Sequence, residues 1–195
     1  MSSETIDTRR RILQAAWDLL EDDRKNGVKM SDIAKAAGIS RQAVYLHFPT
    51  RAELLIAVTL FIDDMNDVDA RLQASRDAGS GEERLDAFID AWANYIPEIH
   101  GCATALIAMQ DTDNAAREAW AGRLAAIREG FEAAVSMLDR EDRLTPDLTT
   151  DQATDLLCAL ISVESWDYLT RRRGWTQAQF FSHMQQAARK LVLAS

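Results

Sequence analysis

Two adjacent side chains in the first third of the chain, Arg41 and Gln42, have the chemistry to recognise the edges of DNA bases. In the major groove an arginine can donate two hydrogen bonds to guanine, and a glutamine can pair with adenine through two hydrogen bonds. Ser40 precedes the pair and can cap a helix, which we expect to end at Phe48 because a proline follows. Arg41 and Gln42 therefore lie at the exposed N-terminal end of a short predicted helix, where a recognition helix contacts bases.

A second short helix is predicted just before this one, and a glycine turn joins the two. Ser31 is the expected N-cap, and Asp32 places a carboxylate in the first turn, where it suits the positive end of the helix dipole. Gly38 follows at the position where helices end in a left-handed residue. The buried face of this helix is predicted to consist of Ile33, Ala34 and Ala37. Two short helices joined in this way form a helix-turn-helix, whose second helix enters a major groove.

The same segment carries a family motif. The residues that define it are Ala37-Gly38-Ile39-Ser40, Val44-Tyr45-Leu46-His47-Phe48, Arg51 and Leu54-Leu55, with Gly27 and Asp32-Ile33-Ala34 upstream. This pattern resembles the tetracycline-repressor (TetR) family of one-component regulators, over roughly residues 7–60. It departs from the family in two places: Lys29-Met30-Ser31 stands where a small polar residue such as threonine is frequent, and Arg51 replaces the usual lysine.

The resemblance implies a set of contacts to DNA. Tyr45, His47 and Arg51 match motif positions that hold phosphates in the family. Arg41 and Gln42 are candidates for base contacts, and Ser40 and Thr50 stand just before the helices that start at Arg41 and near Arg51. The full set of candidate DNA-binding residues is Ser40, Arg41, Gln42, Tyr45, His47, Thr50 and Arg51.

The resemblance also implies how the protein acts. We expect a repressor that binds a pseudo-palindromic double-stranded DNA operator as a homodimer, with its recognition helices about 34–36 Å apart. A small, largely apolar effector would release the operator by binding another conformation more tightly. The alternatives are a ligand-independent or activating regulator, and a helical adaptor whose helix-turn-helix no longer binds DNA.

The remainder of the sequence predicts helices and no strands, because no window alternates with period two. Helices are expected at about 8–21, 51–74, 82–95 (ending before Pro97), 104–110, 114–138, 151–172 and 176–193, with loops at 78–81 and 139–150. The predicted fold class is all-α, with an N-terminal three-helix helix-turn-helix domain at residues 1–50 and a C-terminal helical bundle at residues 51–195. The resemblance assigns effector binding and dimerisation to the bundle.

Large apolar side chains in the C-terminal part are candidates for an effector pocket, although plain core packing is the alternative for each of them. Glu164 falls within an apolar stripe of the predicted helix 151–172, where a carboxylate is either half of a salt bridge or a polar anchor for a ligand. The tentative pocket consists of Trp92, Tyr95, Met109, Trp120, Phe131, Glu164, Trp166 and Tyr168. The dimer interface is expected on the last two helices, through Leu156, Leu160, Val163, Phe180, Met184 and Leu191.

The net charge of −9 argues against non-specific DNA binding by most of the chain. Basic and acidic residues are nearly balanced over the first 60 residues, whereas acidic residues outnumber basic ones in the remainder. DNA binding is thereby confined to a small basic face, and a neutral or cationic effector is favoured over an anionic one. Arg9, Arg10 and Arg11 allow two interpretations: they solvate the first turn of a helix, or they lie near the DNA backbone as this arm does in the family.

Other classes of function find little support. No nucleophile elbow or phosphate loop occurs, so we do not expect an enzyme, and no cofactor is implied. His47, His100 and His183 are too far apart in sequence to suggest a metal site, and Cys102 and Cys158 suggest apolar fillers in a reduced compartment. The N-terminus lacks the apolar core of a signal peptide, and no run of 18 apolar residues could span a membrane, so a cytoplasmic protein is expected.

Overall fold

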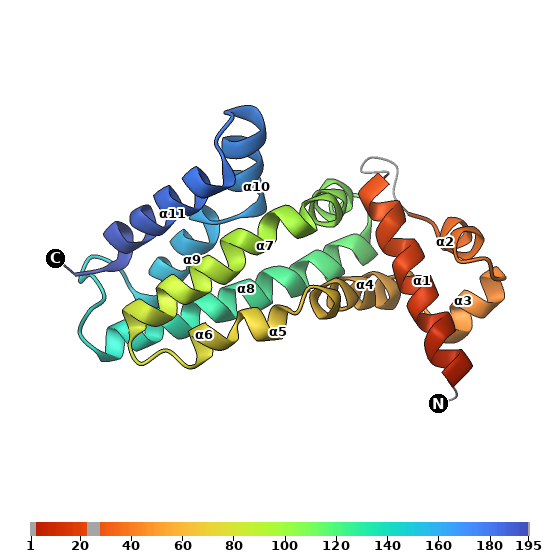
Figure 1. The fold of residues 1–195 in the computed structure, drawn as a ribbon, viewed down its shortest axis with the longest axis horizontal. Helices are drawn as coiled ribbons and strands as arrows, with labels where there is room; N and C mark the ends of the chain where they lie inside the picture. The colour runs from red at the N-terminus through yellow and green to blue at the C-terminus, as the bar shows by residue number, and fades with distance from the viewer. Residues whose placement is uncertain (1–2, 23–27, 195) are drawn as a thin grey trace. The chain divides into compact units, whose positions relative to one another are not determined.

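The computed structural model describes residues 3–22 and 28–194, which are mostly helical (Figure 1). These residues contain no strand, apart from an isolated bridge between Leu144 and Leu193. The all-α prediction is confirmed, whereas Gly27 of the family motif lies outside the described residues. The elements are α1 (Ser3–Asp22), α2 (Met30–Ala36), α3 (Arg41–His47), α4 (Arg51–Met65), α5 (Val68–Arg71), α6 (Gln73–Arg76), α7 (Gly81–Met109), α8 (Asn114–Arg140), α9 (Thr150–Leu160), α10 (Val163–Trp166), the π-helical turn η1 (Asp167–Arg172) and α11 (Gln177–Val192).

The helices form two compact units. The first unit contains the described residues up to Asn66 together with Ile99–Arg123, and the second contains Asp67–Glu98 together with the described residues from Leu124 onward. Helices α7 and α8 each contribute residues to both units. The predicted helix-turn-helix falls wholly in the first unit, and helices α9 to α11 fall wholly in the second.

Helix α1 supports the helix-turn-helix within the first unit. Its apolar residues recur at helical spacing and are buried, as expected for an amphipathic helix: they are Ile12, Leu13, Ala15, Ala16 and Leu20. Helix α1 packs against α2 and α4, and α2 packs against α3 (Figure 1). The helix begins at Ser3, several residues before the predicted start at Thr8.

Helix α4 ends at Met65, and the prediction of a helix to about residue 74 is wrong. The side-chain amide of Asn66 donates a 2.8 Å hydrogen bond to the Ile62 carbonyl, and Asp67 takes a left-handed conformation with φ of 50°. Asn and Asp enter this region more readily than other non-glycine residues, because their short polar side chains bond locally. The chain therefore leaves the helix at residues 66–67 and continues as the single-turn helices α5 and α6.

Helix α7 runs through Pro97, so the prediction of two separate helices at 82–95 and 104–110 is wrong. A proline inside a helix leaves the carbonyl four residues earlier without its backbone donor. Here that carbonyl belongs to Ala93, and Gln177 of α11 replaces the missing donor through its Nε2 atom at 2.9 Å. The Gln177 Oε1 atom accepts a 2.7 Å hydrogen bond from the Trp166 indole. A side chain from another helix thus satisfies the backbone group that Pro97 leaves unpaired.

The predicted helix 151–172 is interrupted after Leu160, so the prediction of one continuous helix is wrong. The Ser162 hydroxyl accepts a 3.0 Å hydrogen bond from the Ser165 N–H and starts a new helix, so the Ile161 carbonyl loses its helical donor. The Trp92 indole donates to that carbonyl at 2.7 Å. The apolar stripe predicted to include Glu164 is therefore broken, and Glu164 is exposed.

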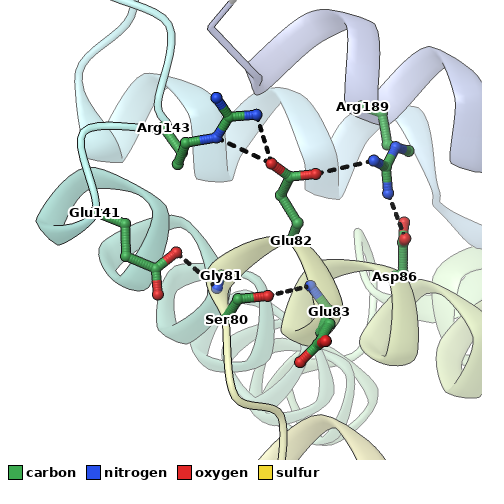
Figure 2. Close-up of polar contacts among 8 residues, drawn as sticks. All are labelled: Ser80, Gly81, Glu82, Glu83, Asp86, Glu141, Arg143 and Arg189. Atoms are coloured by element: carbon green, nitrogen blue, oxygen red, sulfur yellow. Dashed lines mark hydrogen bonds and ion pairs between the residues drawn. The ribbon is translucent and has the colours of Figure 1, made fainter.

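Charged side chains join the start of α7 to α11 and to the loop after α8 within the second unit (Figure 2). Glu82 accepts hydrogen bonds from Arg143 Nε at 3.0 Å and from Arg189 Nη2 at 2.9 Å, and Asp86 forms a further ion pair with Arg189. The hydrogen bond from Arg143 is the main reason that the pKa of Glu82 lies below its usual value. Glu82 therefore stays ionised and anchors two later segments to the beginning of α7.

The contact between Gln177 and Ala93 gives a test of how Pro97 is tolerated. Gln177→Leu should destabilise the protein by about 1–3 kcal/mol, because it removes the hydrogen bonds that Gln177 makes with the Ala93 carbonyl and the Trp166 indole. In a Pro97→Ala background the restored N–H can bond Ala93, so the same replacement should cost less by about 1 kcal/mol. Urea unfolding of the four proteins measures this coupling, and equal costs in both backgrounds would contradict the account.

Candidate nucleic-acid interface

The turn between α2 and α3 is closed by backbone and side-chain hydrogen bonds. Gly38 has a φ of +68°, the left-handed conformation predicted for it, and the Ile39 N–H donates to the Ala34 carbonyl at 3.0 Å. Arg11 of α1 donates to the Ala37 carbonyl at 2.6 Å and so satisfies the C-terminal end of α2. These bonds fix the angle at which the chain enters α3.

The other end of α2 differs from the prediction. The N-cap residue is Lys29 and no side chain caps this end, so Ser31 lies inside the first turn and is not the N-cap. Its hydroxyl approaches the Asp32 carboxylate at 3.5 Å. Asp32 is in the first turn of α2, as predicted.

Helix α3 buries one side and exposes the other. Ser40 caps the helix as predicted, since its hydroxyl accepts a 3.1 Å hydrogen bond from the Ala43 N–H. Val44 and Phe48 are 0% and 2% exposed, and the guanidinium of Arg9 lies 4.8 Å from the centre of the Phe48 ring. The inner side of α3 is therefore an apolar anchor.

The outer side of α3 carries the residues that we predicted to contact DNA. Arg41, Gln42 and Tyr45 are exposed, and the Arg41 guanidinium lies over the Tyr45 ring at 5.5 Å while donating to its hydroxyl at 3.2 Å. His47 is half-buried at the end of the helix. Thr50 is exposed and caps α4 by accepting a hydrogen bond from the Glu53 N–H at 3.1 Å.

Leu46 is a further member of this outer side that we did not predict as a candidate. It is 81% exposed, the largest value among the exposed large apolar residues of the described chain. The sequence contained one indication of this position, because Gln42 and Leu46 are four residues apart and therefore lie on the same face of a helix.

Arg51, which we expected to contact a phosphate, makes contacts within the protein that the sequence did not predict. Its Nε atom donates to the Val28 carbonyl at 2.7 Å, and its guanidinium forms an ion pair with Asp113. The Asp113 carboxylate also accepts a 3.0 Å hydrogen bond from the Ala115 N–H at the start of α8. Arg51 therefore ties the start of α4 to the segment between α7 and α8, and its charge is already neutralised by a partner.

The three arginines of α1 also make contacts inside the first unit. Because α1 begins at Ser3, they follow the first turn, and the interpretation that they solvate that turn is wrong. Arg9 covers Phe48 and Arg11 holds the Ala37 carbonyl, as described above, while Arg10 approaches the sulfur of Met65 at 3.4 Å. Two of the three thus stabilise the helix-turn-helix directly.

Helix α1 is attached to α7 by a partly buried contact. The Glu21 carboxylate accepts a 2.9 Å hydrogen bond from the Cys102 N–H and a 3.4 Å hydrogen bond from the Trp17 indole. The contact requires glycine at position 101, because a Cβ there would lie 1.7 Å from a Glu21 oxygen. Glu21 and Arg51 are therefore two polar links that hold the helix-turn-helix against α7 and the start of α8.

A cavity of about 20 Å³, enough for about one water molecule, lies within the first unit. Its walls include Asp63, Cys102, Trp120 and Arg123, and Asp63 forms a 2.5 Å ion pair with Arg123. Burial raises the pKa of the Cys102 thiol to about 12, so it remains protonated. Trp120 is thus the one tentative pocket residue that lines this cavity.

The other tentative pocket residues have varied surroundings. Glu164 and Tyr168 are exposed, and the exposed fraction of Tyr168 is 52%. The prediction that Glu164 is a buried carboxylate is therefore wrong, and neither residue lines an enclosed site. Met109 is buried in the first unit, with its sulfur 4.0 Å from Arg51. The remaining four are buried in the second unit: Trp92, Tyr95, Phe131 and Trp166.

Other kinds of site find little support in the described residues. No group of three or more His, Cys, Asp or Glu residues that could hold a metal occurs in residues 3–22 and 28–194. Over the same ranges no single helix is long and apolar enough to cross a membrane. Helices α3 and α4, which are bent relative to each other, reach that length and apolar character only when they are taken together.

Comparison with known proteins identifies the helix-turn-helix. The family described as "Bacterial regulatory proteins, tetR family" matches residues 12–58, which include the second half of α1, all of α2 and α3, and the first half of α4. The match shows similarity to that family over these residues. The resemblance read from the motif around Tyr45 and His47 is thereby confirmed.

Individual family members extend the similarity. The chain is 26% identical over 117 residues to the HTH-type transcriptional regulator CymR of Pseudomonas putida, covering 60% of this chain and 58% of CymR. It is 40% identical over 62 residues to the HTH-type transcriptional regulator EthR of Mycobacterium tuberculosis, covering 32% of this chain and 28% of EthR. Each match thus spans between about a quarter and three fifths of the curated relative.

The fold as a whole is also that of solved structures. The crystal structure of NalD, the secondary repressor of the MexAB-OprM multidrug efflux pump in Pseudomonas aeruginosa, superposes with a TM-score of 0.70 at 22% identity. The match covers 99% of both chains. The match therefore includes the helical C-terminal part of this chain.

The pairing of Arg51 predicts an unusual result for a basic residue of this motif. Arg51→Ala should destabilise the protein by about 1.5–3 kcal/mol and weaken DNA binding, because it frees the start of α4 from Val28 and Asp113. The slope of log affinity against log salt should stay unchanged, since no phosphate contact is lost. Asp113→Asn is the matched control, which breaks the same pair but keeps the arginine. A slope reduced by about one per subunit would show that Arg51 binds a phosphate.

Proposed function

We propose that this protein is a one-component transcriptional regulator, which binds a pseudo-palindromic operator as a homodimer and is released by a small effector. The observation that carries the proposal is the division of α3 into a buried side and an exposed side that presents Arg41 and Gln42. Both exposed side chains can make bidentate hydrogen bonds to base edges in the major groove. A helical adaptor would have no need to keep this chemistry at the free surface of α3.

Repression is the direction of regulation that we propose. NalD is a repressor by its description, and many members of the family act in this way. The alternative is activation, since the chain is also 32% identical over 89 residues to the transcriptional activator FasR of Mycolicibacterium smegmatis. The position of the operator relative to the promoter distinguishes the two.

Dimerisation is proposed through the C-terminal helices, with a smaller set of residues than the sequence predicted. Val163, Phe180 and Met184 are at most 8% exposed in the single chain, so they belong to the core of the second unit. Leu156 of α9 is 41% exposed and remains available to a second copy. Two half-site contacts made by one dimer would give the affinity that one helix-turn-helix lacks.

For the effector, we propose that the cavity beside Trp120 is the site that opens. A polar link between the cavity wall and α1 supports this choice, because the Glu21 carboxylate of α1 bonds the backbone of Cys102 in that wall. A ligand larger than one water must enlarge the cavity, and it therefore favours a conformation in which that wall has moved. The site is mostly apolar with one ion pair, which suits a small apolar or neutral molecule.

The base-reading role of Arg41 is tested with an operator obtained by unbiased selection with the purified protein. Arg41→Ala should weaken binding by about 1–3 kcal/mol and relax the preference at one position of each half-site. Lys35→Ala is the matched control, since Lys35 is an exposed basic residue on α2, and it should leave base preference unchanged. Equal weakening on all sequences would reduce Arg41 to a phosphate contact, and a selection without any enriched sequence would contradict the proposed function.

The effector site is tested by titrating a panel of apolar compounds. A true effector should raise the melting temperature, quench tryptophan fluorescence and weaken operator binding over one concentration range. Trp120→Phe should remove most of the quenching, whereas the control Trp92→Phe should keep it, because Trp92 does not line the cavity. If every stabilising compound leaves operator binding unchanged, a ligand-independent regulator is the better account.

A further inference from the structure

Leu46 is the most exposed large apolar side chain among the described residues and it lies on α3. Its neighbours Val44 and Phe48 are buried on the other side of the helix, so the fold already has its apolar anchor there. An 81% exposed leucine gains almost nothing from folding, because its side chain stays in water. The structure therefore gives Leu46 no role in holding α3 in place.

Its surroundings are polar, which argues against a surface for a protein partner. Gln42 lies one helical turn before Leu46, and Arg41 is stacked on the Tyr45 ring. Exposed apolar patches that bind proteins are contiguous over several hundred Å². Leu46 is instead a single apolar side chain among side chains that can form hydrogen bonds.

The edges of DNA bases offer one apolar feature in the major groove, the C5-methyl group of thymine. A leucine placed against any other base edge would remove water from a donor or acceptor without replacing its hydrogen bond. We infer that Leu46 contacts a thymine methyl group and makes thymine the preferred base at one position of each half-site. This inference rests on the proposed function, since it requires α3 to lie in the major groove.

The inference also places that thymine relative to the other contacts. Gln42 and Leu46 share one face of α3 and are separated by about 6 Å along the helix axis. The thymine should therefore lie within one or two base pairs of the base that Gln42 contacts, and further from the base that Arg41 contacts.

The test uses the selected operator with single thymines replaced by deoxyuridine, which removes only the methyl group. For the unaltered protein, each half-site should contain one position at which replacing thymine by deoxyuridine weakens binding by about fourfold. This is the effect of losing one apolar carbon from the contact. Leu46→Ala should bind thymine and uracil equally at that position, while its response at all other positions is unchanged. Leu46→Met should retain the discrimination, because methionine keeps an apolar side chain of similar volume.

Leu60→Ala is the matched control, since Leu60 is 58% exposed but lies on α4, and it should behave as the unaltered protein does. The melting temperature of Leu46→Ala should also be unchanged. Equal binding of thymine and uracil operators by the unaltered protein, or discrimination that survives in Leu46→Ala, overturns the inference while leaving the proposed function intact. Absence of any sequence-specific binding overturns both.

Discussion

Helix α3 has only seven residues, and a helix of that length is not stable alone in water. Its conformation depends on the burial of Val44 and Phe48 on one side, with the Ser40 cap at its start. Because the inner residues provide the packing, the outer residues Arg41 and Gln42 contribute little to folding and are available for recognition. The proposed regulator depends on this division of one short helix into a packing face and a reading face.

The position of α3 depends in turn on contacts from distant parts of the chain. Arg11 of α1 satisfies the end of α2, and Arg51 at the start of α4 is paired with Asp113. Glu21 joins α1 to the backbone of α7 at Cys102. These links lie within one compact unit, so a change in the wall of the cavity beside Trp120 has a direct physical route to the helix-turn-helix.

Local rules predicted the parts of the structure that local interactions determine. Gly38 was expected in the left-handed region and Ser40 as a cap, and both are, because a turn and a cap involve only neighbouring residues. The rule failed at Ser31, where Lys29 takes the cap position and no side chain satisfies the helix end. The all-α fold was also predictable, since helical periodicity extends over most of the chain.

The errors arise where a distant side chain changes the local outcome. Pro97 was expected to end a helix, but Gln177, 80 residues later in the sequence, bonds the carbonyl that the proline leaves free. The break after Leu160 is accompanied by a hydrogen bond from Trp92, and it exposes Glu164, which had been expected to be buried. The ion pair between Arg51 and Asp113 was not predicted either, because Asp113 is again far away in the sequence. No pattern within a window of neighbouring residues contains these partners.

The central claim is that two copies of α3 lie in successive turns of one major groove. It is tested most directly by methylation interference on the selected operator, because dimethyl sulfate methylates guanine N7 in the major groove and adenine N3 in the minor groove. The account predicts interference at guanine N7 in two clusters whose centres lie about 10–10.5 base pairs apart, or a multiple of that distance. A single cluster would contradict the dimer, and interference confined to adenine N3 would contradict recognition through α3.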